Sequence, residues 1–541
     1  MDIVIGLMGG LGLFLYGMNL MGDGLQKSAG AKLKKIIELL TSNVIMGVLV
    51  GMLVTMVIQS SSATTVMVVG FVNAGIMSLT QAIGVIMGAN IGTTITAQLV
   101  SLDVDFLAPI SLGIGIVIYM FAKKSKTRHI AEILLGFGIL FTGMEFMKDA
   151  VSPLKEYEGF TNMLLSFGSN PILGVLMGFA ITAIVQSSSA SMGMLIALAS
   201  EGLIPITAAL PILYGENIGT CVTSLISSIG ATKNARRAAV MHLTFNLIGS
   251  LIFMFILSGP IVKLVTYIDP DNTARQIANA HTLFNVINVL ILLPFNKLIV
   301  KLAIKLVPET EGEEEDDNKI IKYIDDRMIE TPSIALTNTL KETIRMGEKA
   351  KECFNYSMEG ILENSEKKVE KAFKKERHVN ELQKSILSYL LKLSKSSLND
   401  NAIETVDALF SVVNDIERIG DHSENIAELA KIAIDSKLKF SQDATKELTE
   451  MYEKVLSTYS YAIDAMEKSD VELAYKIIRM EERVDLMEKS YRANHMQRLN
   501  NSTCNFETGI IYLDIITNLE RISDHSLNIA QQVISGRIVF K

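Results

Sequence analysis

Hydrophobic residues divide the chain into two parts with different patterns. Residues 1–306 are a succession of apolar runs broken by glycine and short polar turns, and several runs are long enough to cross a bilayer. From residue 333 onward, apolar residues recur at helical spacing within charged segments. The acidic stretch within 307–332 joins the two parts as a solvated linker. This pattern predicts an all-α chain, with a polytopic membrane domain at 1–306 and a soluble helical domain at 333–541.

The membrane part contains an internal repeat. The run Gln59-Ser60-Ser61-Ser62 recurs 127 residues later as Gln186-Ser187-Ser188-Ser189. Over 43–96 against 170–223, 22 of 54 positions are identical without a gap. Together with a weaker match nearer the N-terminus, this predicts repeat 1 at about 1–127, repeat 2 at about 128–258 and a final span at 280–306.

Lysine and arginine positions predict how the repeats cross the membrane. Basic loops at 27–35, 123–128 and 233–237, and a basic cluster after the last span, are assigned to the cytoplasm. Equivalent loops of the two repeats then fall on opposite sides of the membrane, which defines an inverted repeat. The resulting prediction is a multi-pass protein of the cell membrane, with its N-terminus outside and its C-terminal domain in the cytoplasm.

The segments that carry the Gln-Ser-Ser-Ser runs, 44–76 and 171–203, are too short for two full spans each. They are predicted to be re-entrant helical hairpins with the polar run at the tip. The alternative is one long helix whose serines bond to their own backbone. Two identical polar runs at a fixed offset favour a binding site.

The residue types in these runs indicate which solute they hold. Serine hydroxyls and the glutamine amide both donate and accept hydrogen bonds, and helix N-termini favour anions. Neither run contains Lys or Arg, so a multivalent anion bound there needs a cation to balance its charge. The composition of the site therefore favours cation-coupled anion transport.

A second pair of polar elements lies at the same offset, at 88–93 and 215–220. Their glycines are expected to weaken the helix so that Asn90, Thr93, Asn217 and Thr220 complete a pocket. The alternative is that the glycines only allow close helix packing. Where repeat 1 has alanine, repeat 2 has Glu216, which is a functional candidate unless it lies at a solvated helix end.

The paired Gln-Ser-Ser-Ser runs, each followed by Asn-Ile-Gly-Thr, resemble the type II sodium–phosphate cotransporter family over essentially all of 1–306. The resemblance implies import of inorganic phosphate coupled to sodium, by alternating access around a central site. It implies phosphate contacts at Gln59, Ser60, Ser61, Ser62, Gln186, Ser187, Ser188, Ser189, Asn90 and Asn217. Sodium contacts are predicted at Gln59, Ser61, Thr64, Thr93, Gln186, Ser188, Thr220 and Glu216.

The soluble part is predicted to hold six helices, near 333–363, 367–396, 401–435, 443–467, 470–499 and 505–536. They form two three-helix units about 103 residues apart, and 9 of 14 positions over 414–427 recur in the second unit. The shared motif places Glu417 and Asp421, and likewise Glu520 and Asp524, on one helix face, where a pair of carboxylates suits a cation. The alternative is a network of ion pairs with the neighbouring arginines.

These units resemble PhoU domains, which are regulators of bacterial phosphate handling. The resemblance implies a bound metal ion, divalent or iron-type, at Glu417, Asp421, Glu520 and Asp524. It also implies a regulatory role for the soluble part. Candidate partners are therefore phosphate, sodium, the lipid bilayer, a second copy of the chain and a cytoplasmic regulatory protein.

Composition narrows the remaining alternatives. The net charge of −8 argues against nucleic acid, and three scattered cysteines predict neither a disulfide framework nor a zinc site. An intramembrane serine hydrolase is disfavoured because a nucleophile needs a positioned base, and His242 and His281 lie in no partner motif. Transport of another oxyanion and a membrane phosphate sensor remain the alternatives to phosphate import.

Overall fold

The computed structural model describes residues 2–38, 43–102, 104, 106–160, 162–163, 170–308, 321–329, 331–396, 398, 400–501 and 504–538, without the side chains of 2 and 30–38. The chain separates into two compact units, Met1–Glu315 and Asp316–Lys541. All regular secondary structure in the described residues is helical, which confirms the all-α prediction. Residues 309–320 and 330 of the predicted linker lie outside the described residues.

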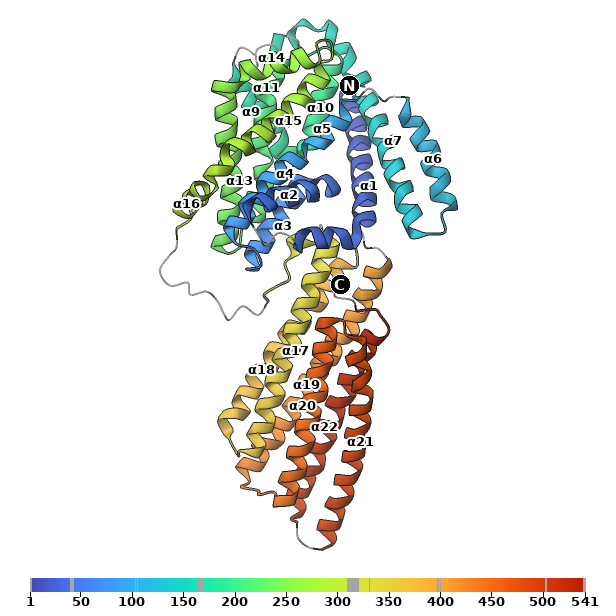
Figure 1. Ribbon diagram of the computed structural model, residues 1–541, viewed down its shortest axis with the longest axis vertical. Coiled ribbons are helices and arrows are strands. Elements are labelled where there is room, and N and C mark those ends of the chain that lie inside the picture. Colours follow the sequence, from blue (N-terminus) through green and yellow to red (C-terminus); the bar gives the residue numbers. More distant parts are fainter. Residues whose placement is uncertain are drawn as a thin grey trace. The chain divides into compact units, whose positions relative to one another are not determined.

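Unit 1 is a bundle of helices of very different lengths (Figure 1). Its elements are α1 (Asp2–Glu38), α2 (Val44–Ile58), α3 (Ser61–Asn73), α4 (Leu79–Gly92), α5 (Thr94–Val100), α6 (Leu107–Phe121), α7 (Ser125–Val151), η2 (Ser152–Glu156), α9 (Pro171–Val185), α10 (Ser188–Ser200), α11 (Ile206–Gly219), α12 (Cys221–Ser227), α13 (Lys233–Ile252), η3 (Phe253–Leu257), α14 (Ser258–Ile268), α15 (Thr273–Leu292), η4 (Leu293–Phe295) and α16 (Asn296–Leu306).

Five stretches of the described residues are long and apolar enough to cross a membrane. They are Ile3–Ala29, Leu79–Val100, Ser125–Glu156, Lys233–Ile268 and Thr273–Leu306. The helices α2, α3, α6, α9 and α10 are apolar but shorter than a span. Outward-facing side chains of unit 1 include large apolar residues such as Ile172 and Ile184, as expected for a surface that faces lipid rather than water.

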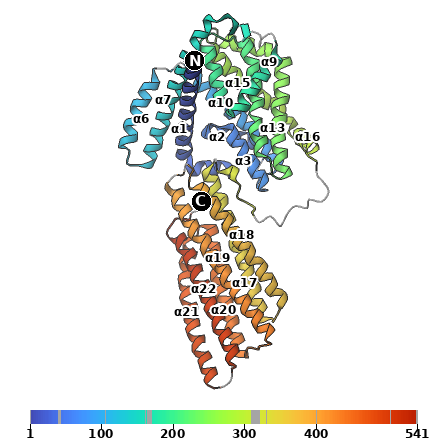
Figure 2. The ribbon, with the colours of Figure 1, turned by 180° about the vertical axis from the view of Figure 1, so that it is seen from behind.

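The helices α1 and α7, which occupy equivalent positions in the two repeats, pack directly against each other (Figure 2). A Cβ at Gly17 would lie 2.7 Å from the carbonyl oxygen of Gly136, and a Cβ at Gly143 would lie 2.6 Å from that of Gly10. Gly10 corresponds to Gly136 in the repeat, and Gly17 corresponds to Gly143. The contact is therefore reciprocal, as in a two-fold interface, and it depends on glycine because no side chain fits between the backbones.

Each predicted hairpin consists of two helices joined by two residues. Gln59 and Ser60 separate α2 from α3, and Gln186 and Ser187 separate α9 from α10. The single long helix that we considered as an alternative is therefore excluded. In each repeat, the first helix of the pair packs along the helix that follows the hairpin, α2 along α4 and α9 along α11.

Unit 2 is an elongated bundle of six long helices (Figures 1 and 2). They are α17 (Pro332–Leu362), α18 (Glu366–Leu393), α19 (Asp400–Asp435), α20 (Gln442–Lys468), α21 (Val471–Asn500) and α22 (Phe506–Ile534), preceded by η5 (Asp326–Met328). Each helix begins and ends within a few residues of its predicted bounds. Long amphipathic helices whose apolar stripes face one another account for this agreement.

The segment that enters the bundle is fixed to it. Glu342 of α17 is fully buried, and its carboxylate accepts hydrogen bonds from the backbone N–H groups of Lys322 and Tyr323. The Tyr389 hydroxyl donates to the Asp325 carbonyl at 3.0 Å, and the Met328 side chain is fully buried. Residues 321–329 are thus part of the bundle rather than free linker.

Candidate functional site

The two Gln-Ser-Ser-Ser runs have the same backbone geometry. Gln59 has φ 60° and Gln186 has φ 56°, both in the left-handed region. Each glutamine ends the preceding helix, and its N–H donates to a threonine carbonyl, Thr55 or Thr182, at 2.7 Å. Left-handed backbone is uncommon for residues other than glycine and is often held at functional positions. Its presence in both copies shows that the duplicated residues adopt a duplicated structure.

The serine after each glutamine caps the following helix. The Ser60 hydroxyl accepts from the Ala63 N–H at 3.1 Å, and the Ser187 hydroxyl accepts from the Ala190 N–H at 3.3 Å. Such capping typically stabilises a helix by ~1 kcal/mol. These two hydroxyls therefore stabilise the start of the second helix in each hairpin.

A pair of hydroxyls ties the two helices of each hairpin together. In repeat 1 Thr55 donates to Thr64 at 2.9 Å, and Thr64 donates to the Ser60 carbonyl at 3.0 Å. In repeat 2 Thr182 donates to Ser191 at 3.0 Å. Thr64, a predicted sodium contact, thus has a clear role in fastening α2 to α3.

The last two serines of each run lie in the first turn of α3 or α10. The hydroxyls of Ser61, Ser62, Ser188 and Ser189 make no hydrogen bond within the described part of the chain. The first N–H groups of a helix have no partner inside the helix. Each hairpin tip therefore presents two hydroxyls and a helix N-terminus that remain available to a ligand.

The two tips differ in how the glutamine side chain is held. Gln59 is 6% exposed, and its Oε1 accepts from the hydroxyl of Thr96 on α5 at 3.1 Å. In repeat 2 the corresponding residues are Gln186, which is exposed, and Thr223, whose buried hydroxyl has no partner among the described residues. The glutamine–threonine bond is therefore present in one repeat only.

Gly88 and Gly215 serve close packing, so the helix weakening predicted at these two positions is wrong, whereas at Gly92 and Gly219 each helix does end, with one residue before α5 or α12 begins. The helices α4 and α11 run without interruption to Gly92 and Gly219. A Cβ at Gly88 would lie 2.0 Å from the Val48 carbonyl oxygen, and a Cβ at Gly215 would lie 2.0 Å from that of Val175. Glycine is needed there because backbone meets backbone.

The polar residues of these elements are buried but not equivalent in their contacts. Asn90 donates to the side-chain oxygen of Asn246 on α13 at 3.0 Å. Asn217 donates to the Leu213 carbonyl of its own helix at 2.9 Å, and the Thr220 hydroxyl donates to the Asn217 carbonyl at 2.6 Å. Thr93 is also buried, at 7% exposure. Among the described residues, Asn90 is the only one of these four whose side chain bonds to another helix.

Glu216 lies within α11 and is 2% exposed, so it is not at a solvated helix end. One of its carboxylate oxygens, Oε2, is buried without a hydrogen-bond partner in the described part of the chain. A carboxylate in a low-dielectric interior requires either a cation or a proton. The position therefore fits a bound cation.

The structure adds polar residues on α13 and α15 that the motifs did not indicate. The imidazole of His242 bonds Ser224 at 3.1 Å, and Asn246 joins Asn90 to Cys221. On α15, His281 Nδ1, Asn285 Oδ1 and both amide atoms of Asn288 are buried without partners among the described residues. Their spacing of three or four residues along otherwise apolar helices was the available signal.

In unit 2 the structure brings carboxylates from neighbouring helices together. Oxygen atoms of Glu481 and Asp485 on α21 and of Asp524 on α22 lie within 4.8 Å of one another. Three hard oxygen donors at this separation fit a divalent cation such as Mg²⁺, Mn²⁺ or Ca²⁺. Of the four residues predicted from the motif, only Asp524 is in this group, and the motif missed Glu481 and Asp485 because they lie on a different helix.

Carboxylates lie close together around both Glu-x-x-x-Asp motifs, and their pKa values are raised. Burial, together with Asp485 and Asp524, raises the pKa of Glu481 to about 7. Burial, together with Glu424 and Asp421, raises the pKa of Glu376 to about 7. Burial also raises the pKa values of Glu417 and Glu520. Carboxylates that resist ionisation for lack of countercharge are the groups that a metal ion stabilises.

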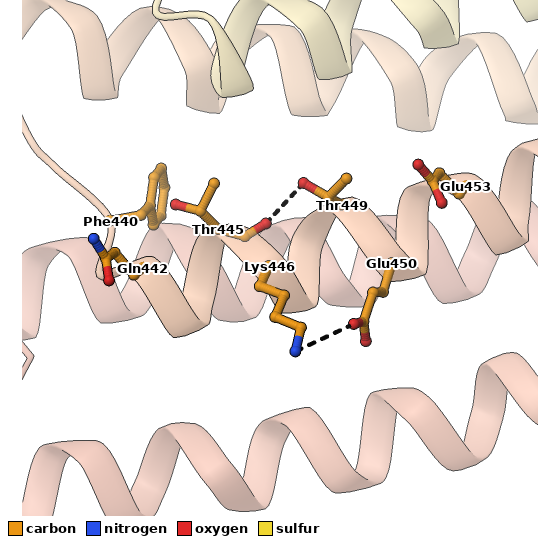
Figure 3. Close-up of a pocket in the computed structure, with 7 residues that line it drawn as sticks. All are labelled: Phe440, Gln442, Thr445, Lys446, Thr449, Glu450 and Glu453. Carbon is orange, nitrogen blue, oxygen red and sulfur yellow. Dashed lines mark hydrogen bonds and ion pairs between the residues drawn. The ribbon is translucent and has the colours of Figure 1, made fainter.

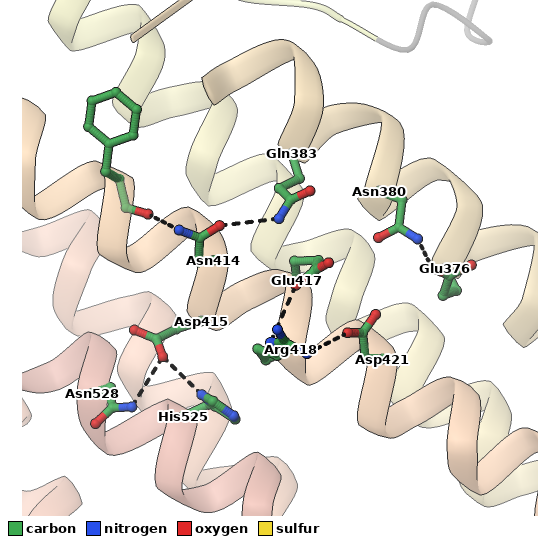
Figure 4. A network of polar contacts seen from close by, with 11 residues as sticks. Glu376, Asn380, Gln383, Asn414, Asp415, Glu417, Arg418, Asp421, His525 and Asn528 are labelled. Atoms are coloured by element: carbon green, nitrogen blue, oxygen red, sulfur yellow. Dashed lines mark hydrogen bonds and ion pairs between the residues drawn. The ribbon is translucent and has the colours of Figure 1, made fainter. Parts of the chain in front are cut away.

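The neighbouring arginines and histidines complete this network, of which Figure 4 shows Arg418 and His525. Arg418 lies 3.5 Å from Asp421 and Arg521 lies 3.7 Å from Asp524, so the ion pairs considered as an alternative are present, although long. The histidines bond across the two three-helix units, His422 to Asn518 and His525 to Asp415, each at 2.9 Å. His422 thus bonds an amide, and His525 bonds a carboxylate that is not part of either Glu-x-x-x-Asp motif.

A shallow hollow on the surface of α20 is a weaker candidate (Figure 3). It has a volume of about 550 Å³ and is lined by Phe440, Gln442, Thr445, Lys446, Thr449, Glu450 and Glu453. Its single cation, Lys446, lies 3.9 Å from Glu450. A phosphate placed there would meet two carboxylates, so the hollow does not fit an anion.

Each half of the chain matches a known protein family. The Na⁺/Pi-cotransporter family matches residues 13–149 and 154–288, and the PhoU domain matches 343–430 and 448–533. The putative inorganic phosphate export protein YjbB of Escherichia coli K12 is 26% identical over 544 residues, covering 98% of this chain and 97% of that protein. Human sodium-dependent phosphate transport protein 2B is 31% identical over 204 residues, covering 36% of this chain and 29% of that protein.

The crystal structure of PhoU from Pseudomonas aeruginosa is 19% identical, covers 36% of this chain and 94% of that one, and superposes with a TM-score of 0.35. The family match extends over both copies of the repeat and includes both Gln-Ser-Ser-Ser runs. The chain is therefore a membrane protein of the Na⁺/Pi-cotransporter family, a family of phosphate transporters rather than enzymes, and it carries PhoU domains in its C-terminal half.

Proposed function

We propose that this protein imports inorganic phosphate together with sodium by alternating access. The observation that carries the proposal is the duplicated helix break, in which a left-handed glutamine and a capping serine are followed by two hydroxyls at a helix N-terminus that make no hydrogen bond within the described residues. Free N–H groups and hydroxyls are the donors that phosphate oxygens require. The serines at 61, 62, 188 and 189 are the proposed phosphate contacts, with the two glutamines beside them.

Sodium is the proposed countercharge because neither run contains a cationic side chain. Glu216, with one buried oxygen lacking a partner among the described residues, is the proposed anionic sodium ligand. Hydroxyl and amide oxygens of Gln59, Gln186, Thr93 and Thr220 are the proposed neutral ligands. A cation that is transported with phosphate balances its charge in the membrane and then leaves with it, which a fixed arginine cannot do.

The proposed mechanism uses the two repeats as inverted halves. The reciprocal packing of α1 against α7 supports a two-fold relation between them, and the basic loops support opposite orientations in the membrane. Re-entrant hairpins entering from the two sides would then place both tips near the membrane centre, where such transporters bind their substrates.

Uptake into sealed vesicles tests the proposed coupling. Purified protein in liposomes is expected to accumulate labelled phosphate when sodium is higher outside, and not when potassium replaces sodium. Sulfate in excess should leave uptake unchanged, since competition by sulfate would favour a general oxyanion transporter. Phosphate binding without accumulation would instead indicate a sensor.

The direction of transport is tested in the same vesicles. The Escherichia coli relative is named as an export protein, so vesicles loaded with labelled phosphate and sodium are measured against sodium-free buffer. A coupled carrier is expected to run in whichever direction the sodium gradient favours. Efflux without any dependence on sodium would contradict coupling.

Glu216→Gln is expected to raise the sodium concentration needed for half-maximal uptake by about tenfold, because cation affinity at an oxygen site falls when a charged ligand is replaced by a neutral one. The concentration of phosphate needed at saturating sodium should change far less. Glu145→Gln, which makes the same chemical change at an exposed position of α7, is the matched control. An unchanged sodium dependence in the Glu216 variant would exclude this carboxylate as a ligand.

For the PhoU-domain half we propose a regulatory role with a bound metal ion. The donor set around Glu481, Asp485 and Asp524 fits a divalent cation, and the raised pKa of Glu481 indicates that the site lacks countercharge. Burial and the negative charges of Asp524 and Asp485 raise the pKa of Glu520, which therefore belongs to the same group of carboxylates. In the other three-helix unit, Glu417 and Asp421 are the corresponding candidates.

A further inference from the structure

The two three-helix units place corresponding residues around their Glu-x-x-x-Asp motifs, which permits a position-by-position comparison. On α18, Glu376-Arg377-His378-Val379-Asn380 corresponds to Glu481-Glu482-Arg483-Val484-Asp485 on α21. Both segments lie against the helix that carries the motif, α18 against α19 and α21 against α22. Differences between them therefore change the surroundings of the proposed metal ligands directly.

The first difference is at the position of the third ligand. In the second unit Asp485 joins Glu481 and Asp524, and its Oδ1 is buried without a hydrogen-bond partner among the described residues. In the first unit Asn380 takes this place and donates its amide N–H to Glu376, the counterpart of Glu481 (Figure 4). The amide thus supplies no charge and occupies an oxygen that a cation would need.

The second difference is one of charge. Arg377, which interacts electrostatically with Glu376 and Glu424, corresponds to Glu482 in the second unit, so a positive side chain beside the carboxylates is replaced by a negative one. One exchange runs the other way, because Glu424 in the first unit corresponds to Leu527. Despite that extra carboxylate, no three carboxylate oxygens of the first unit gather within 4.8 Å in the described residues.

We infer that the two PhoU units bind metal unequally: the second unit, with Glu481, Asp485 and Asp524, loads first, and Asn380 holds the first unit in a weaker state. This inference rests on the proposed metal binding of the PhoU-domain half, and it specifies which residues make the metal affinities of the two units different. Cation affinity at oxygen sites rises with the number of charged ligands. One carboxylate exchanged for an amide therefore separates the two affinities by about tenfold or more.

The inference is tested by metal loading of the full-length protein purified in detergent and stripped with chelator. Dialysis against increasing free Mn²⁺, with bound metal measured by elemental analysis and by electron paramagnetic resonance, gives the loading curve. In the unaltered protein, half of the bound Mn²⁺ is expected to load at concentrations at least about tenfold below the other half. A single loading step that fills all sites together would overturn the inference.

Two reciprocal variants assign the steps to residues. Asp485→Asn gives the second unit the pattern of the first and should remove the tight step. Asn380→Asp does the reverse and should convert the weak step into a tight one, so the test does not depend on a loss that misfolding could mimic. A tight step that survives Asp485→Asn, or a weak step unchanged in Asn380→Asp, would refute the assignment.

The loading curve also separates this inference from the proposals on which it rests. If the protein binds no Mn²⁺ at millimolar concentrations, metal binding itself is refuted, and the inference with it. Sodium-driven phosphate uptake by the same preparation measures the transport proposal independently. Uptake that persists while both sites stay empty would leave the transport proposal intact.

Discussion

Ser61→Ala and Ser188→Ala are each expected to lower sodium-driven phosphate uptake by about 10- to 100-fold, with normal yield and thermal stability of the protein. The expected size follows from the loss of a hydrogen bond to a charged ligand, which is worth about 1.5–3 kcal/mol. Neither hydroxyl makes a hydrogen bond within the described part of the chain. Removing either hydroxyl should therefore weaken phosphate binding while leaving the stability of the fold nearly unchanged.

Two controls separate this effect from a structural one. Ser227→Ala makes the same chemical change on α12, where the hydroxyl only donates to the Ser224 carbonyl of its own helix, and should leave uptake unchanged. Ser60→Ala removes a helix cap and should lower thermal stability, by ~1 kcal/mol. Normal uptake in both Ser61→Ala and Ser188→Ala would show that the hairpin tips do not contact phosphate.

Gly215→Ala and Gly88→Ala are expected to lower the thermal unfolding midpoint of the membrane unit by roughly 2–12 °C and to reduce the yield of monodisperse protein. The added Cβ would lie 2.0 Å from a backbone carbonyl oxygen in each case, and neither helix can move without disturbing the other contacts of its hairpin. Overpacking of this kind typically costs about 1–3 kcal/mol or more, and one kcal/mol corresponds to roughly 2–4 °C in a unit of this size.

Gly113→Ala on α6 is the matched control, because a Cβ added to Gly113 would have no atom within 4 Å. Alanine favours helix over glycine by about 1 kcal/mol, so this variant should be unchanged or slightly more stable. The comparison is read from thermal unfolding in detergent, followed by size-exclusion chromatography. Equal midpoints for Gly215→Ala and Gly113→Ala would mean that α9 and α11 separate easily, contrary to their close backbone contact.

The helices of the PhoU-domain half can be placed from sequence to within a few residues. The range 443–467 is predicted for α20, which runs from Gln442 to Lys468. Such agreement is expected where a long amphipathic stripe has no competing structure. The sequence also indicates the hairpins, because a polar run inside a short apolar segment leaves few other arrangements in a membrane.

The roles of individual residues are harder to predict. The glycines at 88 and 215 are expected from sequence to weaken their helices, and they instead allow two backbones to touch. Asn90 donates a hydrogen bond to Asn246, which lies 156 residues further along the chain on another helix. No local pattern carries such information, because it depends on which helix faces which.

By itself, the sequence determined the two-part organisation, the duplication and the identity of the duplicated polar residues, because periodicity and repetition are written along the chain. Only the tertiary structure decided which of those side chains already have a hydrogen-bond partner in the described part of the protein. It showed that Ser60 and Ser187 are used as caps, that the hydroxyls of Ser61 and Ser188 are not bonded within the described residues, and that Asp485 joins Asp524 from another helix. Hydrogen-bond partners and charge neighbours are set by the packing of distant segments, so they appear only once the chain is folded.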